Sequence, residues 1–244
     1  MKDIRNLRRY LKNLKVIKSF YVKALKLLGP HKGYELNRRL RSPYSSIEKS
    51  NRVIFVHIPK AAGNAVVRSI WGGEATGHDS LERYYNCNQK LFHNSYRFTF
   101  VRNPWDRIVS AFFYLKQGGI GYFDKQFACK YLKEIDTFES FVLTLDQDPN
   151  FRDAVMKWVH FIPQIEFLKI NGKELECMNF VGKVENFQQD MIKLCDHLGI
   201  KPDKEIKVIN ASERNQYREY YNINTQAIVA KLYNADIQAF NYEF

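Results

Sequence analysis

The sequence predicts an α/β fold, a three-layer sandwich in which helices cover both faces of a central parallel sheet. Three runs of strand length, 53–56, 98–101 and 178–184, are separated by segments with helical periodicity. Strands that alternate with helices are typical of parallel sheets. The first two runs are apolar at successive positions, as expected for strands buried on both faces. A chain of 244 residues, 45% of them hydrophobic, is long enough for one such core.

The first strand, 53–56, leads into a turn and then a helix. Pro59 and Gly63 end the strand, and an apolar helical pattern follows at 65–70. The first N–H groups of a helix have no partner within it and carry a partial positive charge, so they bind oxyanions readily. Lys60 adds a mobile full charge at the same place. This turn is therefore a candidate site for an anionic, phosphorylated ligand.

The turn differs from the phosphate loop of nucleoside triphosphatases. That loop has the pattern G-x-x-x-x-G-K-[ST], in which a late lysine is followed by a hydroxyl residue that binds magnesium. Here the lysine, Lys60, comes early, and no serine or threonine is next to it. The sequence also lacks a convincing apolar strand that ends in a magnesium-binding aspartate. It therefore favours an anionic nucleotide bound without a metal, and it disfavours a nucleoside or sugar kinase.

The second strand, 98–101, also leads into a turn and a helix. The dipeptide Asn-Pro at 103–104 ends the strand, and proline suits the first position of a helix. Arg102 stands at the strand end, where its guanidinium can bind a phosphate through two hydrogen bonds. Ser110 lies two turns into the helix. Its hydroxyl reaches the same phosphate if that face lines the cleft, and the ordinary alternative is a hydrogen bond to the preceding turn.

From about residue 125 the sequence is mainly helical. Apolar residues recur every three or four positions in four segments, 137–148, 151–162, 185–199 and 224–240. The second of these segments contains His160, which we interpret as a core histidine. The last is expected to form one long helix.

The two turn segments together resemble the sulfotransferases that use 3′-phosphoadenosine 5′-phosphosulfate (PAPS). VHIPKAAGNA, residues 56–65, resembles the 5′-phosphosulfate loop of the carbohydrate sulfotransferases related to heparan sulfate 2-O- and chondroitin 4-O-sulfotransferases. FVRNPWDRIVSAF, residues 100–112, resembles the 3′-phosphate motif of the same family, including the spacing from arginine to serine. The resemblance continues more weakly in HFIPQIEFL, FVGKVENFQQD and the terminal FNYEF, so that it covers roughly residues 52–244.

The resemblance implies a fold of the P-loop nucleotide-binding type and a specific donor site. Lys60 is expected to contact the phosphosulfate bridge, and Arg102 and Ser110 are expected to hold the 3′-phosphate. The reaction implied is transfer of a sulfuryl group from PAPS to a saccharide hydroxyl, without a metal. The other expected donor-binding positions in the first turn are Ala61, Gly63, Asn64 and Ala65.

The first turn departs from the family pattern. Members usually carry hydroxyl residues around the glycine, in the manner of HIPKTAGTS, whereas this chain has Ala61, Asn64 and Ala65. A neutral hydrogen bond contributes about 0.5–1.5 kcal/mol, so the lost hydroxyl donors would weaken donor binding without abolishing it. The alternative function is therefore a sulfotransferase-like protein that binds a nucleotide or glycan with weak or no activity.

Sulfuryl transfer needs a base to accept the proton of the acceptor hydroxyl, and histidine is the natural candidate near neutral pH. His78 lies in a polar segment between the two motifs, the interval in which relatives resembling heparan sulfate 2-O-sulfotransferase place their catalytic histidine. We predict His78 as the base, with His93 as the alternative. His57, directly before the first turn, is expected to orient Lys60 or to pack.

Near the C-terminal end, the polar segment 210–221 contains two arginines between helices. We expect it to form a loop that closes over the nucleotide, with Arg214 as the residue that helps to hold the 3′-phosphate. A solvated basic loop is the alternative interpretation.

Positive charge is concentrated at the start of the chain. Residues 1–41 hold 13 lysines and arginines against two acidic residues, a net charge of +11 of the +12 of the whole chain. Apolar residues at helical spacing predict a basic amphipathic helix, which can lie on an anionic membrane surface or bind a polyanionic glycan. The alternative is a helix that packs on the enzyme. We therefore divide the chain into a leader and linker, 1–51, and a sulfotransferase domain, 52–244. Confinement of the charge to the leader argues against a nucleic-acid partner.

No run of 18 or more apolar residues and no secretory signal pattern are present in the sequence. The four cysteines lack metal or redox spacing and are expected to be free thiols of a reducing compartment. These features predict a cytoplasmic enzyme, with peripheral attachment to the inner membrane surface if the leader binds lipid.

Overall fold

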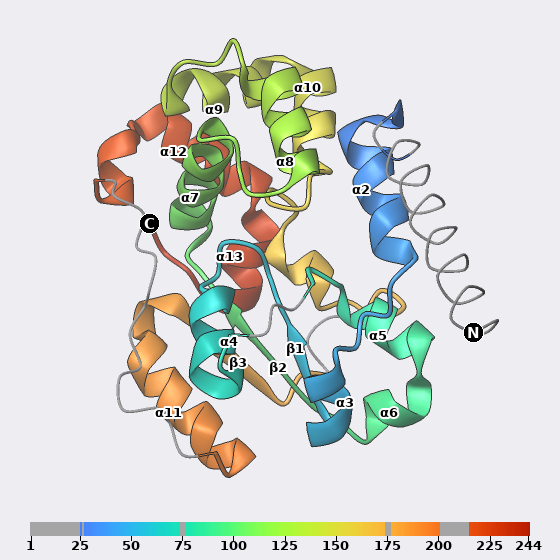
Figure 1. Ribbon diagram of the computed structural model, residues 1–244. Coiled ribbons are helices and arrows are strands. Elements are labelled where there is room, and N and C mark those ends of the chain that lie inside the picture. Colours follow the sequence, from blue (N-terminus) through green and yellow to red (C-terminus); the bar gives the residue numbers. More distant parts are fainter. Residues whose placement is uncertain (1–24, 26, 74–76, 174–176, 201–214) are drawn as a thin grey trace, which may run out of the picture.

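The computed structural model describes residues 25, 27–73, 77–173, 177–200 and 215–244 (Figure 1). The expected amphipathic helix at the start of the leader falls largely on residues 1–24 and 26, which lie outside the described residues. Within the described part, no helix combines the length and the apolar character that crossing a bilayer requires.

A parallel sheet of three strands lies at the centre of the molecule. The strands are β1 (Val53–Val56), β2 (Tyr96–Val101) and β3 (Phe180–Lys183), in the order β1-β2-β3. Val56 pairs with Thr99, and Val101 pairs with Lys183, so the carboxyl ends of all three strands meet at one edge of the sheet. The three strands expected from the sequence are confirmed.

The helices of the described residues vary in length from one turn to nearly four turns. They are α2 (Gly29–Arg39), α3 (Ser46–Asn51), α4 (Gly63–Trp71), α5 (Leu81–Cys87), α6 (Gln89–His93), α7 (Pro104–Lys116), α8 (Tyr122–Phe127), α9 (Phe138–Gln147), α10 (Pro149–Met156), α11 (Phe187–Leu198), α12 (Ile223–Leu232) and α13 (Asn234–Phe240). A π-helical turn (Ala128–Leu132) and 3-10 turns at Gln164–Phe167, Val184–Asn186 and Tyr217–Tyr220 complete the set.

Helices cover both faces of the sheet. On one face, Val53 and Phe55 of β1 pack in a buried apolar cluster with residues of α4 and α11. On the other face, Ile54 and Val56 belong to a larger cluster that includes residues of α5, α7 and α9. In Figure 1, α4 and α11 lie together beside the sheet, while α7, α9 and α12 lie beyond its carboxyl end. The predicted three-layer α/β fold with a central parallel sheet is confirmed.

Two of the expected helices are shorter than predicted. In the segment 151–162, helix α10 ends at Met156. Tight turns follow, in one of which the N–H of Phe161 donates to the carbonyl of Trp158 (2.7 Å). The expectation that His160 lies in a helix is therefore wrong, although its side chain is buried as predicted. Pro163 disfavours helical geometry in the residue before it, and burial of the bulky side chains fixes the turns.

The segment 224–240 forms two helices, α12 and α13, which meet at Tyr233. The Tyr233 hydroxyl donates to the carbonyl of Phe161 (2.8 Å), and the carboxylate of Asp236 accepts from the backbone N–H of Gln164 (2.8 Å) and Ile165 (2.9 Å). These contacts with a distant segment override the helical periodicity of the sequence.

Residues 42–51, the last part of the expected leader and linker, are a structured part of the fold. Helix α3 begins with a capping box between Ser45 and Glu48. The buried Glu48 carboxylate also accepts from the N–H of Phe55 (3.2 Å) and from the hydroxyl of Tyr84 (3.0 Å). This segment is therefore fastened to β1 and α5. The division of the chain into a leader and linker, 1–51, and a domain, 52–244, stays a prediction.

Helix α2, the described part of the leader, packs beside α8 (Figure 1). A side chain at Gly33 would lie 2.5 Å from a ring carbon of Phe123, so glycine permits this close approach.

Candidate active site

The turn between β1 and α4 has an unusual backbone. Lys60 (φ 68°) and Ala62 (φ 58°) adopt the left-handed conformation, which side chains other than glycine rarely take. Ala62 precedes α4, which begins without a side-chain cap. Successive N–H groups in such turns form concavities that bind anions, and the first N–H groups of the helix add to them. The backbone of this turn thus suits the anion that the sequence predicted.

The other expected donor-binding positions in this turn point in different directions. The side chains of Ala61 and Ala65 are buried in the apolar core. Their backbone N–H groups donate to the carbonyls of Ile58 (3.4 Å) and Ala62 (2.9 Å), so a direct contact of either residue with the donor stays a prediction. Asn64 is exposed at the start of α4. A side chain at Gly63 would lie 2.0 Å from Nε2 of His57, which shows that the imidazole ring of His57 rests directly on the glycine.

Two arginines fasten this turn to the second motif. Nη1 of Arg102 donates to the carbonyl of Lys60 (3.2 Å), and Nε of Arg107 donates to the carbonyl of Pro59 (3.0 Å). Arg107 is fully buried, and burial lowers the pKa of its guanidinium. Its Nη2 also bonds to the carbonyl of Ile162 (2.8 Å). Hydrogen bonds therefore join the two turns at the carboxyl ends of β1 and β2.

Arg102 is itself held in place by its neighbour Asp106. The Asp106 carboxylate accepts from Nε of Arg102 (2.8 Å) and lies 2.7 Å from its Nη2. With Nη1 bonded to the carbonyl of Lys60, these contacts occupy about three of the five N–H donors of a guanidinium. The remaining donors suit a phosphate oxygen. Sequence reasoning missed Asp106, although it lies in the first turn of the expected helix, four residues after Arg102.

Ser110 is buried in α7, two turns after Arg102. Among the residues that the structure describes, the Ser110 hydroxyl forms no hydrogen bond. By contrast, the hydroxyls of Ser69 and Ser95 each donate to the carbonyl four residues earlier. The structure therefore does not support the alternative interpretation of Ser110 as a serine bonded to its own helix.

The ammonium group of Lys60 lies over an aromatic ring. Its Nζ is 4.0 Å from the ring centroid of Tyr114, and the Tyr114 hydroxyl donates to Oδ2 of Asp124 (2.8 Å). Oδ1 of Asp124 lies 3.1 Å from Nε2 of His160. Burial acts to raise the pKa of Asp124, but the hydrogen bonds from His160 and Tyr114 outweigh it and lower that pKa. The carboxylate of Asp124 thus bonds to two residues beside Lys60, Tyr114 and His160.

The rings of three histidines, His57, His78 and His160, lie next to one another near Asp124. The ring of His78 lies 4.4 Å from that of His57 and 5.9 Å from that of His160, between centroids. Burial, together with the neighbouring His57 and His160, holds the pKa of His78 well below its usual value. Burial also lowers the pKa of His160, although Asp124 opposes this effect. Both imidazoles are therefore neutral at physiological pH.

The hydrogen bond of His78 selects its tautomer. Its Nδ1 lies 2.9 Å from the carbonyl oxygen of His57. Because a carbonyl can only accept, Nδ1 carries the proton, and Nε2 is left as the nitrogen with the lone pair. A neutral imidazole with this tautomer has the electronic state that a general base requires.

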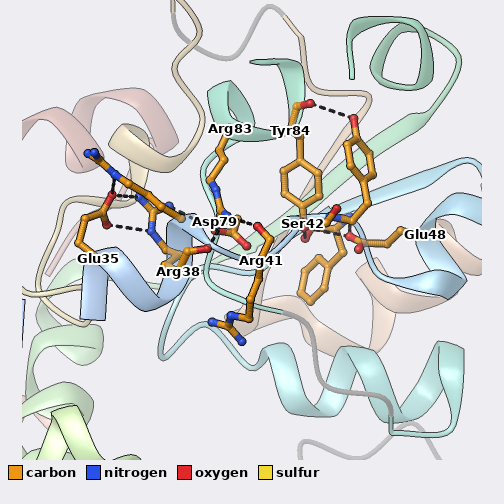
Figure 2. A network of polar contacts seen from close by, with 11 residues as sticks. Glu35, Arg38, Arg41, Ser42, Glu48, Asp79, Arg83 and Tyr84 are labelled. Carbon is orange, nitrogen blue, oxygen red and sulfur yellow. Dashed lines mark hydrogen bonds and ion pairs between the residues drawn. The ribbon is translucent and has the colours of Figure 1, made fainter. Parts of the chain in front are cut away.

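The segment that follows His78 is anchored by a polar network, which Figure 2 shows. The buried carboxylate of Asp79 bonds to Arg38 of α2 (3.2 Å) and to Arg83 of α5. Arg83 in turn donates to the backbone carbonyls of Arg38 and Arg41. The Asp79 carboxylate is therefore paired with two arginines, and these ion pairs hold the neighbouring His78 in position.

Not all of the expected residues come together. His93 is exposed at the end of α6, which leads into the amino end of β2, whereas Lys60 follows the carboxyl end of β1. The alternative base thus lies at the opposite end of the sheet. Arg214 lies outside the described residues, and the segment 210–221, expected to close over the nucleotide, is described only from residue 215.

Sequence reasoning missed Tyr114, Asp124 and His160 as members of the site. Tyr114 lies one turn beyond Ser110 on α7, and that spacing is a signal that the two residues share a face of the helix. No sequence signal joins Asp124 to His160, because 36 residues separate them. In the part of the chain that the structure describes, no cluster of three histidine, cysteine or carboxylate side chains is placed to hold a metal ion, and the four cysteines are free thiols.

Comparison with known proteins adds independent information. Residues 73–243 match the sequence model of the family described as the sulfotransferase family. The chain is also 25% identical over 131 residues to an uncharacterized protein of Archaeoglobus fulgidus, an alignment that covers 54% of this chain and 89% of the archaeal protein. No solved structure matches the chain.

Proposed function

The chain belongs to the sulfotransferase family, and on this premise we propose that it transfers the sulfuryl group of PAPS to a hydroxyl group of a saccharide. The observation that carries the proposal is the hydrogen bond from Arg102 to the carbonyl of Lys60 (3.2 Å). It joins the turns after β1 and β2 into one cationic site at the carboxyl edge of a parallel sheet, where ligands of α/β folds bind.

The donor would lie across the two turns. Its 5′-phosphosulfate would rest on the backbone N–H groups of Ala62, Gly63 and Asn64, at the start of α4, with Lys60 beside it, because the N–H groups of Ala61 and Ala65 donate to backbone carbonyls. Its 3′-phosphate would take the remaining donors of Arg102 and the hydroxyl of Ser110. Arg214 remains a proposed further contact with the 3′-phosphate.

The chemistry follows from the charges of these residues. As the S–O bond to the donor phosphate breaks, negative charge develops on the bridging oxygen, and the Lys60 ammonium would stabilise it. A new S–O bond forms to the acceptor hydroxyl, whose proton would pass to Nε2 of His78. Lys60 cannot be the base, because a neighbouring phosphosulfate raises the pKa of an ammonium group. The products are 3′-phosphoadenosine 5′-phosphate (PAP) and the sulfated saccharide.

A second candidate function is supported by one observation. Ala61 and Ala65 place methyl groups in the core where the resembled loop has hydroxyl donors. Loss of those donors favours a sulfotransferase-like protein that binds the nucleotide or a glycan and turns over slowly. The two candidates differ in rate rather than in where the donor binds.

Calorimetric titration of the full chain with PAP and with ADP, in the absence of magnesium, tests the donor site. Much tighter binding of PAP is expected, because only PAP has a 3′-phosphate for Arg102 and Ser110. Equal affinity for the two nucleotides would reject the proposal. Transfer of radioactive sulfate from PAPS to a mixture of oligosaccharides then separates the two candidates, since the binding protein would take up PAP without measurable transfer.

A further inference from the structure

A cavity of about 380 Å³ lies between α2 and the turns that follow α10. We propose that this cavity is the acceptor site and that it takes an uncharged saccharide; this inference rests on the proposed function. Its volume is within the range of small-molecule sites. The expected donor contacts leave this cavity unassigned, and α2, which forms one of its walls, precedes the residues that match the family model.

His78 connects the cavity to the donor site. It lines the cavity, and its Nδ1 bonds to His57 in the segment that leads to Lys60. A hydroxyl of a molecule in the cavity that reaches Nε2 of His78 would therefore stand beside the turn that is expected to hold the sulfuryl group. Transfer requires this arrangement of donor, base and acceptor.

The charges that line the cavity are balanced and paired. Two carboxylates, Glu35 and Glu166, and two cations, Arg38 and Lys157, belong to the lining. Glu35 bonds to Arg38 (2.9 Å). Lys157 pairs with Asp153 at 2.7 Å, and Glu166 pairs with Lys169 at 2.5 Å. A uronic acid or a sulfated sugar would have to compete with these ion pairs, whereas an uncharged sugar would leave them intact.

The walls combine aromatic surfaces with hydrogen-bonding groups. Tyr34, Trp158 and Phe167 supply the aromatic surfaces, while Ser80 and Glu35 supply polar atoms. A sugar ring presents apolar C–H faces and carries hydroxyl groups around its edge, so it matches both kinds of surface. A phenolic acceptor would contact the same aromatic walls with its ring, so it is the competing class that the test has to exclude.

Helix α2 is fixed in place as one wall of the cavity. Arg38 bonds to Asp79, directly after His78, and Arg83 bonds to the backbone of Arg38 and Arg41 (Figure 2). The base and this wall are therefore anchored to the same carboxylate. A preformed cavity reduces the entropy lost when a ligand binds.

The test fills the cavity without touching the donor site. Ser80 lines the cavity and makes no side-chain cap to α5, so Ser80→Phe removes no capping hydrogen bond. Ser50→Phe, at an exposed position of α3, is the matched control. We would measure PAP affinity by calorimetry and, with PAP bound, the affinity for cellotetraose, chitotetraose and mannotetraose by saturation-transfer NMR. Hyaluronan tetrasaccharide, which is charged, and p-nitrophenol serve as competing classes.

Wild-type protein and Ser50→Phe are expected to bind at least one neutral tetrasaccharide. Ser80→Phe should bind it at least tenfold more weakly while keeping its PAP affinity within twofold. If Ser80→Phe also loses PAP affinity, Glu166→Trp replaces it, because that side chain is 45% exposed and can be enlarged without disturbing the core. It should give the same selective loss.

Failure of this inference is distinct from failure of the proposed function. Wild-type protein that does not bind PAP rejects the proposed function. Wild-type protein that binds PAP overturns the acceptor assignment in three cases: if it binds none of the neutral tetrasaccharides, if it prefers hyaluronan or p-nitrophenol, or if the cavity-filling variants bind the sugar as well as the control does.

Discussion

The side-chain amide of Gln164 pairs with both backbone groups of Arg102. Its Oε1 accepts from the Arg102 N–H, its Nε2 donates to the Arg102 carbonyl, and both hydrogen bonds measure 2.8 Å. The N–H of the next residue, Asn103, donates to Glu185 (2.6 Å), and the amide of Asn103 donates to the carbonyl of Glu243 (2.7 Å). Three segments whose resemblance to the family is weak in sequence thus converge on the 3′-phosphate motif.

Gln164→Leu is expected to destabilise the protein and to weaken PAP binding. Leucine leaves the N–H and carbonyl of Arg102 without their partners, and an unsatisfied buried group costs about 1–3 kcal/mol. The free energy of unfolding in urea should fall by about 2–5 kcal/mol, and PAP affinity should fall because Arg102 is no longer aligned. The exposed control Gln189→Leu should change neither quantity. Unchanged PAP affinity in Gln164→Leu would show that Arg102 is positioned by other means.

Arg102→Ala is expected to abolish the discrimination between PAP and ADP. Loss of hydrogen bonds to a charged group costs about 1.5–3 kcal/mol, so PAP affinity should fall by that amount while ADP affinity changes little. Arg39→Ala, an exposed arginine on α2, provides the control. Equal losses for the two nucleotides in a calorimetric titration would place the 3′-phosphate elsewhere.

His78→Ala is expected to reduce sulfate transfer by about 10²–10⁴-fold, the usual effect of removing a general base. PAP affinity should stay near the wild-type value, because His78 would contact the acceptor rather than the nucleotide. His93→Ala, at the opposite end of the sheet, should transfer sulfate at the normal rate. Collapse of turnover in His93→Ala with normal turnover in His78→Ala would move the base to His93.

Stability is expected to decrease as the solution is acidified below about pH 6.5. The folded-state pKa values of His78 and His160 lie below the usual histidine value of 6.5. For each histidine, at pH values between its folded-state pKa and its unfolded-state pKa, the unfolded chain binds more protons than the folded chain. The free energy of unfolding therefore rises with pH in this window. Each such histidine contributes a slope of up to about 1.4 kcal/mol per pH unit.

Urea unfolding between pH 5 and pH 7.5 measures this dependence. His160→Gln should show a shallower slope than the wild type, whereas Gln189→Leu, which removes no titrating group from an exposed position, should leave the slope unchanged. A wild-type stability that is flat or increases on acidification through this range would contradict the burial of neutral histidines.

Removal of residues 1–24 is expected to weaken attachment to anionic vesicles and to leave PAP affinity unchanged. This segment carries eight lysines and arginines and one acidic residue. Each basic residue near an anionic membrane contributes about 1 kcal/mol. Sedimentation with vesicles that contain phosphatidylserine, compared with neutral vesicles, measures the effect. Equal sedimentation of the full and shortened chains would reject a membrane role for the leader.

Local signals in the sequence were sufficient for the sheet and for the two turns at its edge. Runs of buried apolar residues, followed by Pro59 or Pro104, predict where a strand ends and a helix begins, because each signal depends on neighbouring residues only. The exposed position of Asn64 and the left-handed conformation of Lys60 have no such signal. They depend on the packing of Arg102 and His57 against the turn.

The parts that sequence reasoning missed depend on contacts over long separations. His160 lies in a segment whose apolar residues recur at helical spacing, yet this segment forms a series of turns. Hydrogen bonds with Tyr233 and Asp236 stabilise these turns. The pairing of Gln164 with Arg102 joins residues 62 positions apart. Periodicity reports on one element at a time, so neither relationship can be predicted from it.

The contact between His57 and Gly63 restricts the order in which this protein can change. Because the imidazole ring occupies the space of a side chain at position 63, a larger residue there requires the ring of His57 to move or position 57 to carry a smaller residue. A substitution of His57 that keeps Gly63 meets no such obstacle. The order of the two substitutions therefore matters, and the reason is packing, whether or not a nucleotide is bound.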